Sequence, residues 1–178
     1  MSHSATANHH HAKPEVIPEP KIVNGAYDFK TVNKARFRCF QLPDGSVYYG
    51  EYAYQSIENK DAIYFNLEDV PVGAGEDQST EAREKLVNLV RHRFGIQIYG
   101  RNAEAGNRLS YYSGLWHCDQ KHGVGSHMAF PDGVSSFTGN LRNNEFNGKG
   151  TLIQKVTEGT VSGQHVYNGE FRDGKLDG

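Results

Sequence analysis

The stretch of sequence that decides the fold is residues 112–125, which read YSGLWHCDQKHGVG. It opens as an alternating strand, in which Tyr112, Gly114 and Trp116 share one face. The glycine leaves a space between two rings, and we expect an aromatic ring from a neighbouring hairpin to fill it. The stretch closes on His-Gly-x-Gly at 122–125, where glycine permits a bend and a close backbone approach. One such hairpin cannot bury its aromatic face alone, so the stretch predicts a stack of hairpins.

The same pattern recurs along the chain. A strand of the form aromatic-x-Gly-x-aromatic or aliphatic starts again at Tyr48, Phe137 and Tyr167. In the copies that start at 112, 137 and 167, a second glycine-containing element begins nine residues after the aromatic residue. We expect the repeat positions to form the core and the groove of the repeats. They are Tyr48, Gly50, Tyr52, Tyr112, Gly114, Trp116, His122, Gly123, Gly125, Phe137, Gly139, Leu141, Gly148, Gly150, Tyr167, Gly169 and Phe171.

Glycine is crowded into the part of the chain that repeats. Of the 20 glycines, 15 lie in residues 95–178. Most of these 15 occupy a repeat position or close a turn, as Gly133 does in Asp132-Gly133. Collagen is excluded, because the glycines do not recur at every third residue and the chain has only 6 prolines.

This pattern resembles the MORN repeat, whose unit reads Tyr-x-Gly-x-Trp/Phe, then His-Gly-x-Gly, then Asp-Gly. The similarity is strong over 112–136 and 137–159, good in a terminal half unit at 167–178, and weaker at 35–53. The resemblance and the hairpin pattern together predict a mainly β fold. We expect an elongated single-layer antiparallel sheet of stacked MORN β-hairpins, with one inserted α-helix and a disordered or extended N-terminal arm.

The chain divides into four regions. Residues 1–34 are the N-terminal arm, which contains the triple histidine 9–11 and is predicted to be extended or disordered. Residues 35–53 form a degenerate MORN hairpin, and residues 54–111 are an insertion. Residues 112–178 hold the MORN repeats, the last of which is incomplete.

The insertion is predicted to contain a helix over about 80–94. Ser79 or Thr80 can cap its start, and an apolar stripe runs from Leu86 to Phe94. Gly95 is a suitable residue to end it. Residues 94–99 are a possible back half of an interrupted repeat.

The sequence predicts no catalytic, cofactor or metal site. His117, Cys118, His122 and His127 lie close in sequence, but no paired Cys-x-x-Cys is present. Residues 116–118 are expected to run along a strand, where neighbouring side chains point to opposite faces. Cys118 has no evident catalytic partner, so we expect the protein not to be an enzyme.

The charge of the chain limits its partners. The net charge is −2, which disfavours a general nucleic-acid binder. Residues 95–178 carry eight basic and eight acidic side chains, so a membrane-lipid platform is not expected either. The two cysteines are too few for a disulfide scaffold and suit a reducing compartment.

The resemblance implies a structural or scaffold protein that docks other proteins. Similar proteins are common in cilia and flagella, so the expected location is the cytoplasm and cytoskeleton, in a cilium or flagellum axoneme. The expected partners are axonemal or cytoskeletal subunits, at a radial spoke or a doublet microtubule. The alternatives are a phosphoinositide- or membrane-associated MORN adaptor and a regulatory partner of an enzyme.

Overall fold

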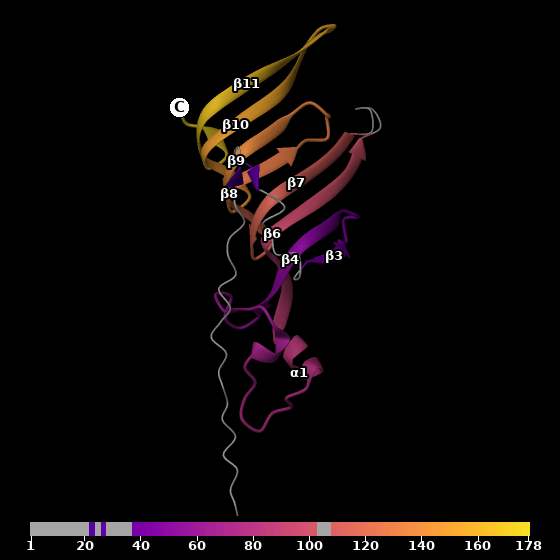
Figure 1. Ribbon diagram of the computed structural model, residues 1–178, viewed down its shortest axis with the longest axis vertical. Coiled ribbons are helices and arrows are strands. Elements are labelled where there is room, and N and C mark those ends of the chain that lie inside the picture. The colour runs from indigo at the N-terminus through magenta and orange to yellow at the C-terminus, as the bar shows by residue number, and fades with distance from the viewer. Residues whose placement is uncertain (1–21, 24–25, 28–36, 103–107) are drawn as a thin grey trace, which may run out of the picture.

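The computed structural model describes residues 22–23, 26–27, 37–102 and 108–178 (Figure 1). Its strands are β1 (Ile22–Val23), β2 (Ala26–Tyr27), β3 (Arg38–Gln41), β4 (Val47–Ser56), β5 (Ile63–Tyr64), β6 (Val87–Asn102), β7 (Arg108–His117), β8 (Gln120–Ala129), β9 (Ser136–Arg142), β10 (Glu145–Glu158), β11 (Val161–Arg172) and β12 (Lys175–Leu176). The short helical elements are η3 (Leu67–Asp69) and α1 (Thr80–Glu84).

Ten of these strands form one open antiparallel sheet. Their order is β12-β11-β10-β9-β8-β7-β6-β4-β3, and β5 pairs with β4 beside this path. The sheet is a single layer that follows the long axis of the molecule, with β10 and β11 near one end and α1 near the other (Figure 1). The predicted mainly β, single-layer architecture is confirmed.

The described part of the predicted arm is a separate two-stranded sheet. β1 pairs antiparallel with β2, and β2 lies against β8 of the large sheet. The rest of the predicted arm, residues 1–21, 24–25 and 28–34, lies outside the described residues.

A row of small residues crosses seven strands of the sheet. Gly50 pairs with Gly95, which pairs with Gly114, and Gly139 pairs with both Ser126 and Gly150. We call the full set the glycine row; it consists of Gly50, Gly95, Gly114, Ser126, Gly139, Gly150 and Gly169. These residues leave one face of the sheet open to a layer of aromatic rings.

Each tyrosine that starts a repeat folds back over the glycine two residues later. Its hydroxyl then donates a hydrogen bond to the carbonyl three residues later. The three bonds run from Tyr48 to Glu51 (2.5 Å), from Tyr112 to Leu115 (2.6 Å) and from Tyr167 to Glu170 (2.9 Å). A Cβ atom at Gly114 would lie 2.5 Å from the Tyr112 hydroxyl oxygen, closer than real Cβ atoms come. The expectation that a neighbouring hairpin fills this space was wrong, because the strand's own Tyr112 fills it.

The second aromatic residue of a repeat joins one unit to the preceding one. The Trp116 ring packs edge-on against Tyr112 of its own strand at 5.0 Å and against Tyr48 of the preceding unit at 5.7 Å. Phe171 repeats this arrangement with Tyr167 at 5.1 Å and Phe137 at 5.3 Å. These rings and Leu141 belong to one buried cluster along one face of the sheet.

The predicted helix over 80–94 is wrong beyond its first turn. Ser79 does cap α1, because its side chain accepts a hydrogen bond from the Ala82 amide. The chain then enters β6 at Val87, and residues 87–91 pair with residues 52–56 of β4. Backbone pairing with a long partner strand outweighs the helical spacing of the apolar residues. Gly95 does not end a helix but belongs to the glycine row.

Strands β4 and β6 form a complete unit whose hairpin tip is replaced by residues 57–86. In this unit Gly50 pairs with Gly95, and Tyr52 pairs with Arg91. Strands β9 and β10 pair with the same spacing, because Gly139 pairs with Gly150 and Leu141 pairs with Phe146. Residues 92–95, His-Arg-Phe-Gly, thus stand where the second unit carries His-Gly-x-Gly. Arg93 adopts a φ of +66°, close to the +80° of Gly148 at the equivalent place.

The glycine pair 123 and 125 behaves differently from the pair 148 and 150. Gly123 and Gly125 both have positive φ, of +85° and +69°. They form a bulge that is one residue longer than the bulge at Gly148 in β10. Ser126 therefore takes the place opposite Gly139, and Gly125 does not match Gly150 as the sequence alignment predicted.

Replacing Gly114 by Ala tests the packing of the ring on the glycine row. The new methyl group forces the Tyr112 ring to move, and we expect a loss of about 2 kcal/mol or more in the free energy of unfolding. Gly163→Ala is the matched control, because Gly163 also lies in a strand but has open space around its Cβ position. Urea denaturation of both variants measures the difference, and equal stability would contradict this packing.

Candidate functional site

The large side chains at the predicted repeat positions lie in the core. Tyr48, Tyr112, Trp116, Phe137, Leu141 and Phe171 each expose 3% of their surface or less. Tyr52, His122 and Tyr167 are half-buried. These residues hold the sheet in shape, so any binding surface is formed by their more exposed neighbours.

A pocket opens beside this core, between the start of the β8–β9 loop and strand β10. Its volume is about 340 Å³. It is lined by Phe130, Asp132, Ser135, Phe146, Leu152 and Gln154. Phe130 and Phe146 are only partly buried, and the Phe146 ring stacks on Phe137 at 3.8 Å. We call this the apolar pocket, and its size and lining suit an apolar side chain from a partner.

The rim of the apolar pocket is held by a turn. The Asp132 carboxylate accepts hydrogen bonds from the amides of Val134 (3.0 Å) and Ser135 (2.7 Å), and from the Ser135 hydroxyl. The Ser135 hydroxyl oxygen in turn accepts a 2.9 Å bond from the Lys155 amide of β10. The pocket is thus preformed by hydrogen bonds within the chain.

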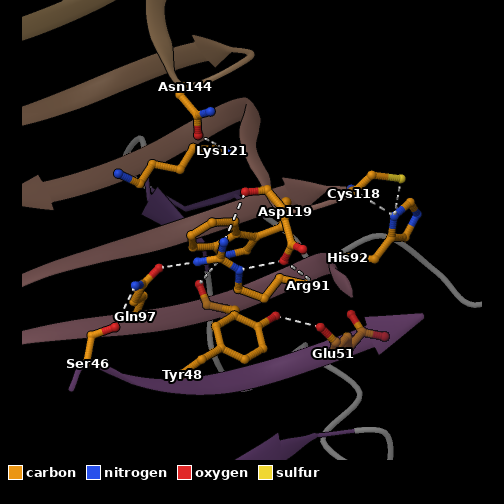
Figure 2. Close-up of polar contacts among 12 residues, drawn as sticks. Ser46, Tyr48, Glu51, Arg91, His92, Gln97, Cys118, Asp119, Lys121 and Asn144 are labelled. Atoms are coloured by element: carbon orange, nitrogen blue, oxygen red, sulfur yellow. Dashed lines mark hydrogen bonds and ion pairs between the residues drawn. The ribbon is translucent and has the colours of Figure 1, made fainter. Parts of the chain in front are cut away.

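A polar network covers the core at the junction of the first and second units (Figure 2). The Arg91 guanidinium lies 4.2 Å from the centre of the Trp116 ring, and its Nε is 2.7 Å from the Asp119 carboxylate. Arg91 also donates to Gln97, whose amide nitrogen donates to the Ser46 hydroxyl at 2.8 Å. The network connects β6 with the β7–β8 turn and the β3–β4 turn, and its role is structural.

The second residue of a hairpin turn binds the backbone of the preceding unit. The Asp119 carboxylate accepts a 2.9 Å bond from the Arg91 amide, and the Asp119 amide donates to the Arg91 carbonyl at 3.0 Å. Asn144 makes the same two bonds with Lys121, of 2.8 and 2.9 Å (Figure 2). We call this pair of bonds the turn lock.

The turn between β11 and β12 keeps only the backbone bond of the turn lock. Gly174 donates its amide to the Phe146 carbonyl at 2.9 Å but has no side chain to accept a bond. The turn lock was not predicted from the sequence, because Asp, Asn and Gly are also the ordinary residues of tight hairpin turns. The signal was the spacing: these residues stand 25 and 30 positions apart, as the repeats do.

Three potential metal ligands come together at the same junction. The side-chain donor atoms of His92, His117 and Cys118 all lie within 4.8 Å of one another. The expectation that residues 116–118 run along a strand was wrong for Cys118, which lies in the turn with a φ of +46°. Of the other two residues in the predicted cluster, His127 bonds instead to Thr138 at 2.7 Å, and His122 lies outside the group.

The thiol and imidazole of this group do not form a catalytic ion pair. Burial raises the pKa of the Cys118 thiol, and the carboxylates of Asp119 and Asp61 raise it further. Burial lowers the pKa of His92 to about 4, with help from His117 and Arg93. At neutral pH the thiol keeps its proton and the imidazole is neutral, whereas a nucleophilic cysteine needs a thiolate.

Asp119→Asn and Asp119→Gly separate the turn lock from the charge of Asp119. Asn keeps the side-chain acceptor, as Asn144 does, and removes only a partly exposed ion pair, so we expect a loss below about 1 kcal/mol. Gly keeps the turn conformation but loses the acceptor, which is expected to cost about 1–3 kcal/mol. Urea denaturation compares the two variants, and an equal loss in both would reject the turn lock.

Comparison with known proteins agrees with the repeat architecture. A family model described as MORN repeat matches residues 112–133, 137–154 and 167–178. These segments cover most of β7 to β12. No curated protein matches the sequence, and none of the helices in the described residues is long and apolar enough to cross a membrane. The chain therefore carries MORN repeats, and the unit made by β4 and β6 has the same strand register.

Proposed function

We propose that this protein is a non-catalytic scaffold that docks other proteins through its repeat sheet. MORN repeats generally mediate interactions with proteins or with membranes. The observation that supports a protein partner here is the apolar pocket, which has Phe130 and Phe146 partly exposed within a preformed rim. An apolar side chain of an extended partner segment would bury against these rings, which is how docking grooves anchor peptides.

The cations on the ring-bearing face favour a protein partner over a lipid headgroup. Arg91 is paired with Asp119 and lies over Trp116. Lys121 lies 5.2 Å from the Tyr99 ring and 5.5 Å from the Tyr112 ring. Burial, aided by Arg91, lowers the pKa of Lys121. Arg91 and Lys121 are thus engaged within the molecule, whereas binding to phosphoinositides needs free positive charge.

A pair of single substitutions tests docking at the apolar pocket. Phe130→Ser removes one wall of the pocket, and Val166→Ser is the control because Val166 is 64% exposed and lies on β11 outside it. Affinity capture from cell extract with mass spectrometry should recover a set of proteins with the wild-type chain and with Val166→Ser. Phe130→Ser should lose that set.

The outcomes of the capture experiment separate the alternatives. Identical sets from both variants would overturn docking at this pocket. Recovery of a soluble kinase or transferase in the lost set would identify the protein as a regulatory partner of an enzyme. Salt-sensitive sedimentation with phosphoinositide liposomes, unchanged by Phe130→Ser, would support the membrane adaptor instead.

The proposed cellular place is the cytoskeleton, in a ciliary or flagellar axoneme. This part of the proposal rests on the MORN resemblance, because similar proteins are common in cilia and flagella. The expected substructure is a radial spoke or a doublet microtubule. Imaging of the tagged full chain in ciliated cells should show signal along the axoneme or at the basal body. A diffuse signal without ciliary enrichment would contradict it.

A further inference from the structure

The junction of the first and second units holds a group of side chains that the scaffold does not require. His92 lies in β6, His117 ends β7, and Cys118 begins the β7–β8 turn. The Cys118 sulfur is 3.8 Å from His92 Nδ1, and the His92 and His117 rings are 5.2 Å apart. Figure 2 shows His92 and Cys118 facing each other at this place.

The third unit shows what the fold needs at these three positions. The third unit is made by β9 and β10. The shared register equates residues 117 and 118 with its Arg142 and Asn143, and residue 92 with its Asn147 and with His122 of the second unit. Asn143 has a φ of +51°, which asparagine tolerates well, whereas Cys118 adopts +46°, a conformation that cysteine rarely takes. The fold therefore accepts a residue without metal affinity at each place, and the cysteine is not there for the turn.

We propose that His92, His117 and Cys118 bind a transition-metal dication of the Zn²⁺ type. Imidazole nitrogens and a cysteine thiolate are ligands that bind zinc, and a set of two histidines and one cysteine also occurs at copper sites. Zn–N and Zn–S bonds of about 2.1 and 2.3 Å place tetrahedral ligand atoms roughly 3.5 Å apart. The donor atoms here lie within 4.8 Å of one another, so small side-chain rotations bring them to that spacing.

The group is accessible to a cation from solvent. The thiol releases its proton to solvent when the metal–sulfur bond forms. His117 is exposed, so the fourth position is open to water or to a ligand from outside the chain.

Cobalt titration of the reduced full chain tests the site directly. Co²⁺ at the proposed site should give a thiolate-to-metal charge-transfer band and tetrahedral d–d bands, which saturate at one ion per chain. Excess Zn²⁺ should remove both. Cys118→Asn, His117→Arg and His92→Asn, which install the residues of the third unit, should each abolish the charge-transfer band or weaken binding at least about 100-fold.

Two controls keep the result specific to the junction. Replacing His9, His10 and His11 by Ala removes the other histidine cluster in the sequence, and Cys39→Ser removes the other thiol. Neither should change the cobalt spectrum. His117 is exposed, so His117→Arg should unfold at the metal-free wild-type temperature and thus separate lost binding from lost folding.

Three results would overturn the proposal. They are the absence of a thiolate band in the wild-type chain, a band that survives Cys118→Asn, and a band that disappears with the 9–11 substitution.

Discussion

The structure depends on a tyrosine ring that lies on the glycine of its own strand. The bond from Tyr112 to the Leu115 carbonyl holds the ring against the backbone, and a side chain at Gly114 would occupy the same space. The repeat motif aromatic-x-Gly is therefore a single device, in which the first residue needs the third to have no Cβ. Phe137 lacks the hydroxyl and keeps the same position, so the ring–glycine contact is the common element and the hydrogen bond is an addition.

Once the rings lie flat on the glycine row, the rest of the unit follows. A ring such as Trp116 fits edge-on between two flat rings, one from each of two successive units. Stacking in this way buries aromatic surface without a second layer of structure. Stability then comes from contacts between neighbouring units, as in other repeat proteins. The turn lock adds a second, polar connection at the edge of the same interface.

The position of the ring–glycine contact also explains where the chain varies. The contact lies within the strands, so the hairpin tip can change without disturbing it. The first unit uses this freedom, because residues 57–86 replace a two-residue turn while Gly50 and Gly95 remain paired. This insertion has its own small cluster of Leu67, Val70 and Val87. Two of the metal ligands proposed above, His117 and Cys118, lie at the tip of the second hairpin, and His92 comes from β6 of the first unit.

The repeats could be predicted from the sequence because their signal is periodic. The spacing of Tyr112, Phe137 and Tyr167 was sufficient for a single-layer antiparallel sheet. The helix over 80–94 was mispredicted, because Val87, Val90 and Phe94 fit a helical stripe as well as a bulged strand, and only the partner β4 decides between them. The back half of the first unit was recognised only over 94–99, because Arg93 replaces the glycine of its bulge.

The sites were less predictable than the fold. The apolar pocket needs Phe130 of one unit and Leu152 of the next, which only the register brings together. His92 lies 25 positions before His117 and 26 before Cys118, so local spacing did not add it to these two residues. Local motifs identify what each unit does for itself, whereas binding surfaces arise between units.

Nuclear magnetic resonance of the full chain tests the central claim most directly. The α-protons of Gly95, Gly114 and Gly150 lie beneath aromatic rings, whereas Gly159 and Gly163 have open space around them. Contact of the rings with the glycine row predicts ring-current shifts to high field for the first three and ordinary shifts for the last two. Ordinary shifts for all five would show that the rings do not lie on the glycine row, and would contradict the account.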